Sequence, residues 1–271
     1  MRAALPAKYV HLGPQAIHCL HTGPTTLPDV PPALDRGTLF VLLHCAGGCA
    51  GMWQKVMAAL ADHHSAIAID LPAHGRSGGV EGPATIDAMV DCVTAVADAL
   101  RLRRFVLVGH SMGGNVALAF AARHPARLAG LGVACAVTAP KLGEVIPRLR
   151  DVVRGRVPQQ FTPELFSPSA TPDVMREFFT LLVTTDPRVR LADFEALDGF
   201  DCAPLLPRIG LPTLVVAGAD DGLAVPDRCR AIADGVAGAR FETIAAAGHA
   251  LPVEQPAALA TLLDGFAGGL R

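Results

Sequence analysis

Residues 105–123 read FVLVGHSMGGNVALAFAAR, in which a short apolar run, a serine flanked by glycines and a longer apolar stretch follow one another. The first five residues have the length of a buried strand, and the last eleven fit a helix. Gly109, Ser111 and Gly113 form a G-x-S-x-G motif at the junction. A sharp turn from strand to helix exposes the serine hydroxyl and leaves no room for side chains at the glycines. The stretch therefore predicts Ser111 as a nucleophile.

Short apolar runs and longer helical patterns alternate along most of the chain. This alternation favours a parallel sheet that is covered on both faces by helices, and the runs are as uniformly apolar as doubly buried strands. We therefore expect an α/β fold with a mostly parallel central β-sheet flanked by helices. The expected strands are Tyr9–Leu12, Ala16–His21, Leu39–His44, Ala66–Asp70, Phe105–Gly109, Leu128–Ala134, Thr213–Ala217 and Phe241–Ile244. The expected helices are Met52–Leu60, Thr85–Leu100 and Gly113–Arg123.

The alternation breaks off between residues 137 and 206, where prolines are frequent and strand signals are few. Residues 176–184 (REFFTLLVT) have a helical pattern. We expect a mostly helical insertion at 137–206, between two strands of a core made of residues 1–136 and 207–271. The Pro-rich stretch at 24–32 is expected to form a surface turn between the first two strands.

The composition excludes several classes of protein. Of the 271 residues, 51% are hydrophobic, the formal net charge is -2 and the basic residues are scattered, so no nucleic-acid partner is expected. No apolar run approaches the ~20 residues that span a bilayer, and residues 1–10 lack the apolar core of a secretory signal. We expect a cytoplasmic protein that binds a small-molecule substrate and no membrane. The sequence indicates no oligomeric state.

The seven cysteines are scattered, which in a long cytoplasmic chain favours free, buried thiols. Cys45 and Cys49 lie near His44, but a C-x3-C spacing without a second pair is not typical of a metal site. We therefore expect no bound metal.

An acid and a histidine follow the serine along the chain. Asp220 and Asp221 come shortly after the apolar run TLVVA at 213–217. A carboxylate at the end of a strand can hold a histidine in the correct tautomer and stabilise its cation. Because adjacent side chains point in different directions, only one aspartate can serve, and we favour Asp221. His249, in a loop near the C-terminus, is then the predicted base that activates Ser111.

The glycine-rich segment His44–Gly48 (HCAGG) follows another predicted strand. Such a loop can aim a backbone N–H at negative charge that develops on a substrate oxygen, and the residue after the nucleophile supplies a second N–H. The predicted oxyanion hole therefore consists of the Ala46 and Met112 N–H groups. The alternative is that this segment forms an ordinary turn between a strand and a helix.

Further motifs agree with this arrangement. Residues 70–77 read DLPAHGRS, and GH at 248–249 is followed by EQP at 254–256. With GHSMGG at 109–114, these motifs resemble those of the α/β-hydrolase superfamily, and the resemblance covers nearly the whole chain. It implies that the insertion is a helical cap over the active site and that no cofactor is needed. The serine in the motif differs from the aspartate of capped epoxide hydrolases and haloalkane dehalogenases, and Cys45 stands where the superfamily usually has glycine.

The expected function is that of a serine hydrolase that cleaves a carboxylic ester of a small or medium apolar substrate through an acyl-enzyme on Ser111. The apolar insertion with its few charges motivates this substrate class. A C–C bond hydrolase of a ring-cleavage diketone would instead need basic residues such as Arg188 and Arg190 at the substrate. A lactonase, thioesterase, perhydrolase or non-enzymatic ligand receptor also fits the fold. Four phenylalanines line a pocket or form a small core of the insertion: Phe161, Phe166, Phe178 and Phe179.

Overall fold

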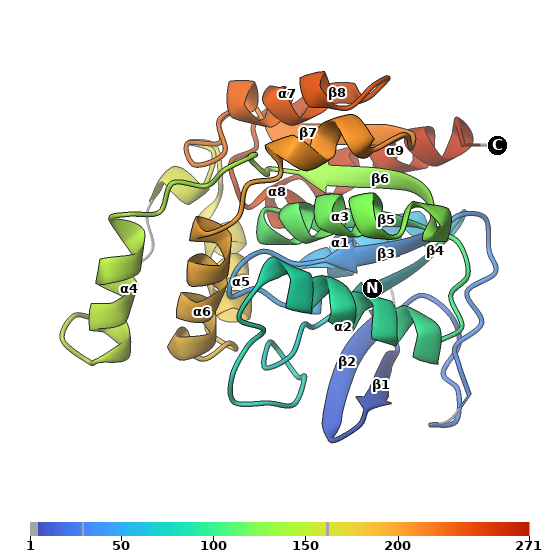
Figure 1. The fold of residues 1–271 in the computed structure, drawn as a ribbon, viewed down its shortest axis with the longest axis horizontal. Helices are drawn as coiled ribbons and strands as arrows, with labels where there is room; N and C mark the ends of the chain where they lie inside the picture. The colour runs from blue at the N-terminus through green and yellow to red at the C-terminus, as the bar shows by residue number, and fades with distance from the viewer. Residues whose placement is uncertain (1–4, 29, 161–162, 271) are drawn as a thin grey trace.

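A single sheet organises the molecule. The computed structural model describes residues 5–28, 30–160 and 163–270 (Figure 1). The strands in these ranges are β1 (Ala7–Leu12), β2 (Gln15–His21), β3 (Leu39–Leu43), β4 (Ser65–Ile69), β5 (Phe105–His110), β6 (Leu128–Ala134), β7 (Thr213–Gly218) and β8 (Arg240–Ile244). They form one sheet in the order β1-β2-β4-β3-β5-β6-β7-β8. β2 pairs antiparallel with β1 and β4, and all other neighbours are parallel, which confirms the predicted mostly parallel sheet.

Helices cover both faces of this sheet. They are α1 (Gln54–Leu60), α2 (Ile86–Ala99), α3 (Met112–Arg123), α7 (Pro226–Gly235), α8 (Leu251–Glu254) and α9 (Pro256–Gly268). Short 3-10 turns occur at Ala50–Trp53, Pro125–Arg127, Pro163–Leu165 and Ala203–Arg208. α2 and α3 pack together on one face, and α1 and α9 pack together on the other (Figure 1). None of the described helices is long and apolar enough to cross a bilayer.

Three helices lie between β6 and β7, where the sequence predicts an insertion. They are α4 (Val145–Val153), α5 (Pro172–Leu182) and α6 (Pro187–Asp198). Figure 1 shows them together beyond one end of the sheet. The helix expected at 176–184 begins earlier, because the Thr171 side chain accepts a hydrogen bond from Val174 N–H and caps α5 there. The division of the chain into a core and an insertion at 137–206 remains a prediction.

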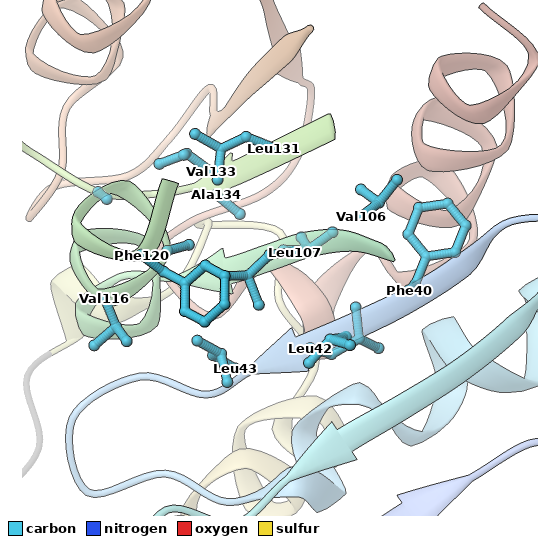
Figure 2. Close-up of a cluster of buried hydrophobic side chains, with 14 of the residues drawn as sticks. Phe40, Leu42, Leu43, Val106, Leu107, Val116, Phe120, Leu131, Val133 and Ala134 are labelled. Carbon is cyan, nitrogen blue, oxygen red and sulfur yellow. The ribbon is translucent and has the colours of Figure 1, made fainter. Parts of the chain in front are cut away.

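The core lies between the sheet and its helices. Every residue of β4, β5 and β7 is buried, as the uniformly apolar runs predict. Figure 2 shows Val116 and Phe120 of α3 directed at the sheet beside Leu43 and Leu107. Full burial of one such side chain stabilises the fold by ~1.5–3 kcal/mol. Because the strands from β3 and β5 to β8 pair in parallel, their carboxyl ends lie at a common edge of the sheet. The loops that follow β3, β5, β7 and β8 meet there.

One expected connection is wrong. β1 and β2 are joined by a tight turn at Gly13 and Pro14, where Gly13 has φ +60°. Leu12 and Gln15 pair directly across this turn, so the hairpin needs no longer loop. The Pro-rich stretch at 24–32, whose residue 29 lies outside the described residues, follows β2 instead.

Candidate active site

Ser111 occupies a sharp turn between β5 and α3. Its φ of 54° and ψ of -116° are values that residues other than glycine rarely adopt. Strain of this kind costs ~1–3 kcal/mol and persists only where the surrounding structure enforces it. Here Ser111 N–H donates to the Ala134 carbonyl at 2.8 Å. A Cβ on Gly113 would lie 2.6 Å from the Leu43 carbonyl oxygen, so only glycine lets this turn approach the end of β3.

Three polar side chains from different loops meet at the end of the sheet. His249 Nε2 lies 3.0 Å from Ser111 Oγ, and His249 Nδ1 lies 2.9 Å from Asp221 Oδ2. Burial raises the pKa of the Asp221 carboxyl, but its hydrogen bond to His249 and its electrostatic interaction with that ring lower the pKa to a net value below the ordinary one. An ionised Asp221 holds the Nδ1–H of His249, which leaves Nε2 to accept the hydroxyl proton of Ser111.

The two adjacent aspartates point in different directions. Asp221 Oδ1 accepts hydrogen bonds from the N–H groups of Leu223 and Ala224, each at 2.8 Å. Asp220 Oδ2 instead accepts a hydrogen bond from the Ser167 hydroxyl at 2.7 Å. The structure therefore brings Asp221 to His249, whereas Asp220 connects its loop to the segment between α4 and α5.

Two further side chains hold the loop that carries His249. His110 Nε2 donates to the His249 carbonyl oxygen at 2.7 Å. Burial and the electrostatic interaction with the nearby His249 ring lower the pKa of His110 to about 3, so the His110 ring is neutral. Glu254 accepts hydrogen bonds from Gly248 N–H at 3.0 Å and from Ser167 N–H at 2.8 Å. Sequence reasoning assigned no role to Glu254, although it lies in the EQP motif.

The backbone of the loop after β3 is fixed by hydrogen bonds. His44 Nδ1 donates to the Cys45 carbonyl oxygen at 2.8 Å, and Gly48 N–H donates to the same oxygen at 2.9 Å. Because C=O and N–H of a trans peptide point in opposite directions, Ala46 N–H points away from His44. Within the described part of the chain, neither Ala46 N–H nor Met112 N–H donates to another protein group. Both donors are available to an external acceptor.

The DLPAHGRS segment ties the loops after β3 and β4 together. Asp70 Oδ1 accepts from Ala50 N–H at 2.5 Å, and Oδ2 accepts from Arg76 N–H at 2.9 Å. His18 Nδ1 lies 2.8 Å from Asp70 Oδ2, and the Ser77 hydroxyl donates to the Asp70 carbonyl at 2.6 Å. These bonds satisfy a buried carboxylate and hold the loop after β3 from one side.

Cys45 points into an apolar cluster between the core and helix α5 of the insertion. Its Sγ lies 3.6 Å from Met52 Sδ. The cluster consists of Cys45, Met52, Leu165, Phe166, Phe178, Leu182, Ala250 and Val253, with Phe179 packed against it. The rings of Phe166 and Phe178 meet edge to face at 5.5 Å. The described phenylalanines therefore form a small core, and Phe161 lies outside the described residues. A side chain at residue 45 is accommodated because it faces this cluster.

The cysteines offer no evident metal site. All seven are free, and burial raises the pKa of Cys45 to about 12 and of Cys49 to about 11. Among the described residues, one group of side chains is close enough to surround an ion, with His110, Cys135 and His249 atoms within 4.8 Å of one another. Both ring nitrogens of His249 already have partners, and burial keeps the Cys135 pKa well above its ordinary value. A protonated thiol is a poor ligand, so this group does not fit a metal ion.

The fold and the three meeting side chains define an α/β-type hydrolase. A model of the alpha/beta hydrolase family matches residues 40–262, and the chain belongs to this family of enzymes, whose members act on small molecules.

Relatives of the chain carry names that state different reactions. The 2-hydroxymuconate semialdehyde hydrolase of Pseudomonas sp. strain CF600 is 30% identical over 261 residues, which cover 86% of this chain and 88% of that protein. The 3-oxoadipate enol-lactonase 2 of Acinetobacter baylyi is 29% identical over 235 residues, with 83% and 86% covered. A solved thermophilic esterase from Thermogutta terrifontis has a TM-score of 0.84 and 26% identity over 99% of both chains.

One relative is much longer. The dihydrolipoyllysine-residue acetyltransferase component of the acetoin cleaving system of Pseudomonas putida is 32% identical over 168 residues. The match spans 62% of this chain but only 43% of that protein, so it concerns one part of the longer polypeptide.

Proposed function

We propose that the protein is a serine hydrolase that cleaves carboxylic esters of small or medium, mostly apolar substrates through an acyl-enzyme on Ser111. The observation that carries this proposal is the continuous line of hydrogen bonds from Ser111 Oγ through His249 to Asp221. A serine hydroxyl alone is a poor nucleophile, and a histidine oriented by a carboxylate activates it. Membership of the hydrolase family and the similarity to a solved esterase support the proposal.

The first half of the reaction forms the acyl-enzyme. Ser111 Oγ attacks the ester carbonyl carbon while His249 Nε2 takes the hydroxyl proton, and Asp221 stabilises the resulting imidazolium. The carbonyl oxygen becomes an oxyanion that accepts hydrogen bonds from Ala46 N–H and Met112 N–H. Each such donor contributes ~3–4 kcal/mol to lowering the barrier. The C–O bond then breaks, and His249 gives its proton to the departing alcohol.

The second half of the reaction releases the acid. A water molecule takes the place of the alcohol and attacks the acyl carbon while His249 accepts one of its protons. The same two N–H groups stabilise the second tetrahedral intermediate. The bond to Ser111 Oγ breaks, His249 returns the proton to that oxygen, and the carboxylic acid leaves.

The segment at 137–206 is assigned the role of a cap over this site. Its described part touches the site from two sides, since Ser167 bonds Asp220 and Asp193 bonds Gly47. The part that meets the core is largely apolar. An apolar cap excludes water and favours substrates whose acyl group buries hydrophobic surface.

A series of p-nitrophenyl esters of increasing acyl length tests the proposal. We expect the wild-type protein to hydrolyse the short and medium esters, and Ser111→Ala to lower kcat/KM by more than about 10⁴-fold. Ser169→Ala changes an exposed serine in the same way and is expected to leave the rate unchanged. Turnover that survives in Ser111→Ala, or a folded wild type inactive on every ester, would contradict the proposal.

A second candidate is hydrolysis of a C–C bond in a ring-cleavage diketone, as the name of one relative states. Such a substrate carries carboxylates. Arg188 is exposed and pairs with Asp186 at 2.8 Å, whereas Arg190 is half-buried and its side-chain carbons pack against Gly47. Arg190 therefore lies beside the loop of Ala46, and this position favours the candidate. Faster turnover of a diketone acid than of any uncharged ester, lost in Arg190→Met, would select it.

A further inference from the structure

A buried carboxylate joins helix α6 to the loop after β3. Asp193 is 0% exposed, although it belongs to a helix of the insertion. Its Oδ2 accepts a hydrogen bond from Gly47 N–H at 2.7 Å, and His74 Nε2 lies 2.7 Å from the same oxygen. Gly47 and Asp193 are 146 positions apart in the chain. A buried carboxylate is costly unless it is paired and hydrogen-bonded. Asp193 Oδ2 meets both conditions, whereas Oδ1 is buried without a hydrogen-bond partner among the described residues.

His74 is the cationic partner of this carboxylate. Its Nδ1 lies 3.0 Å from the Pro72 carbonyl oxygen, and its Nε2 faces Asp193, so both ring nitrogens face acceptors. A ring in this position bonds both partners only when both nitrogens carry hydrogen. Burial lowers the pKa of His74, but the charge and hydrogen bond of Asp193 raise it to a net value above the ordinary one.

The neighbouring His44 is neutral, in contrast to His74. Its ring centroid lies 4.7 Å from that of His74. His44 Nε2 accepts a hydrogen bond from Leu71 N–H at 3.1 Å, so that nitrogen is unprotonated and Nδ1 donates to the Cys45 carbonyl. Burial and the charge of His74 lower the pKa of His44 to about 4. The neutral His44 thus bonds the loop after β3 directly, whereas the charged His74 reaches it through Asp193.

Ala46 lies between the two peptide groups that this network fixes. The Cys45–Ala46 peptide is held through its carbonyl by His44 and Gly48. The next peptide, Ala46–Gly47, is held through the Gly47 N–H by Asp193. Gly47 has φ +66°, and a Cβ there would lie 2.9 Å from Arg190 Cγ. The loop therefore fits under α6 only with glycine at position 47. Ala46 is therefore fixed on its N-terminal side by His44 and Gly48 and on its C-terminal side by Asp193.

A second bond from the insertion reaches the same loop. The Thr185 hydroxyl, just before α6, donates to the Gly48 carbonyl at 3.3 Å. Thr185 Oγ1 also accepts from Gly75 N–H at 3.5 Å. The insertion thus bonds two successive residues of the loop. Asp193 accepts from Gly47 N–H, and the Thr185 hydroxyl donates to the Gly48 carbonyl.

We propose that Asp193 is a positioning residue for the oxyanion hole. By accepting the hydrogen bond of Gly47 N–H, Asp193 fixes the Ala46–Gly47 peptide, so that the hole is complete only while α6 is docked. The inference rests on the proposed function, in which Ala46 N–H stabilises the oxyanion. It gives the insertion a second task besides covering the substrate. Because Asp193 acts through the backbone of the loop, it affects the charged intermediate more than the bound ester.

Asp193→Asn tests this inference, because asparagine has the same shape but replaces the charge-assisted hydrogen bond from Gly47 N–H by a weaker neutral one and leaves His74 without an anionic partner. We expect kcat/KM for the preferred p-nitrophenyl ester to fall by about 10- to 100-fold, mostly in kcat, with KM changed less than about 3-fold. The Ki of phenylboronic acid should rise by a similar factor. This probe bonds its boron to Ser111 Oγ while the proton passes to His249, and the anionic boronate occupies the oxyanion hole.

The control is Asp198→Asn, which makes the same change at an exposed position of α6. Its Oδ1 accepts from Leu142 N–H at 3.1 Å, and the asparagine oxygen can keep that bond. We expect the control to match the wild type in kcat, KM and the boronate Ki. Should Asp193→Asn fail to fold, Thr185→Val removes the second bond to the loop and should shift kcat and Ki in the same direction by a smaller factor.

The outcomes separate this inference from the proposed function. Wild-type turnover that disappears in Ser111→Ala upholds the proposed function. If in that case Asp193→Asn leaves kcat and the boronate Ki unchanged, or lowers only the melting temperature, the inference is overturned. A loss that appears in KM alone also overturns it, because Asp193 would then act on substrate binding. Absence of Ser111-dependent turnover in the wild type overturns both proposals together.

Discussion

The neutral ring of His110 donates a hydrogen bond from Nε2 to the carbonyl oxygen of His249, at 2.7 Å. His110 follows the last apolar residues of β5 and is fully buried directly before Ser111. One residue therefore links the turn that carries the proposed nucleophile to the loop that carries its proposed base. The bond fixes the backbone of His249, whereas Asp221 fixes its ring.

His110→Phe keeps a ring in this place and removes the donor. We expect the free energy of unfolding to fall by ~1–3 kcal/mol, because the His249 carbonyl loses its buried partner. We also expect kcat to fall about 10-fold, since the imidazole is less well placed to accept the Ser111 proton. Urea unfolding and ester kinetics on the same sample measure the two effects. A normal kcat with reduced stability would show that the bond serves the fold alone.

Asp221→Asn and Asp220→Asn form a matched pair of neighbours. Asparagine at 221 has no negative charge with which to hold His249 in its Nδ1–H tautomer, so we expect kcat to fall by about 10³- to 10⁴-fold. An asparagine at 220 can still accept the Ser167 hydroxyl hydrogen, so we expect less than about a 3-fold change. Steady-state hydrolysis of one p-nitrophenyl ester compares the two variants. Equal losses of kcat in both variants would contradict the assignment of Asp221 as the acid that orients His249.

The strands and the serine turn could be predicted because their signals are local. The predicted strands match β3 to β8 within a residue or two. For β4, β5 and β7 the reason is that strands buried on both faces need a nearly uniformly apolar sequence. Ser111, the histidine loop and the choice of Asp221 followed from motif order and position after a strand. The Pro-rich stretch was misplaced, because a two-residue turn at Gly13 already closes the first hairpin.

The contacts across the insertion could not be predicted in the same way. In the sequence Asp193 is an ordinary polar residue of the insertion, and only the docking of α6 on the loop after β3 gives it Gly47 and His74 as partners. His74 belongs to a recognisable motif, but its charge depends on a carboxylate 119 residues away in the chain. Pairings over such distances leave no periodic pattern in one sequence.

Gly113→Ala and Gly143→Ala compare a crowded glycine with an open one. A Cβ at 113 would meet the Leu43 carbonyl at 2.6 Å, whereas a Cβ at 143 would meet nothing within 4 Å. We expect Gly113→Ala to displace the serine turn from the end of β3 and to lower kcat at least 10-fold. Gly143→Ala should leave kcat unchanged and alter the unfolding free energy by less than ~1 kcal/mol. Circular dichroism confirms folding, and a fully active Gly113→Ala would refute the close approach.

The His74–Asp193 pair predicts a specific pH dependence of stability. The groups that face His74 are Asp193 from α6, the neutral His44 ring and, at longer range, the charge of Asp70. The pKa of His74 is raised in the folded protein above the value of ~6.5 that an unfolded histidine has. A raised pKa means that folding binds the proton more tightly. The stabilisation is therefore complete below about pH 6.5 and is lost as the pH rises through the folded value.

Comparison of the wild type with His74→Gln isolates this contribution, because all other titrating groups are shared. Glutamine removes the positive partner of a buried carboxylate, so we expect the variant to be less stable by about 3 kcal/mol at pH 6. The difference should shrink as the pH rises through the folded pKa of His74, because the wild-type ring then loses its charge as well. Urea unfolding of both proteins at several pH values between these limits measures the trend. A difference that stays constant, or grows with pH, would mean that His74 is neutral in the folded protein and that Asp193 is held by other partners.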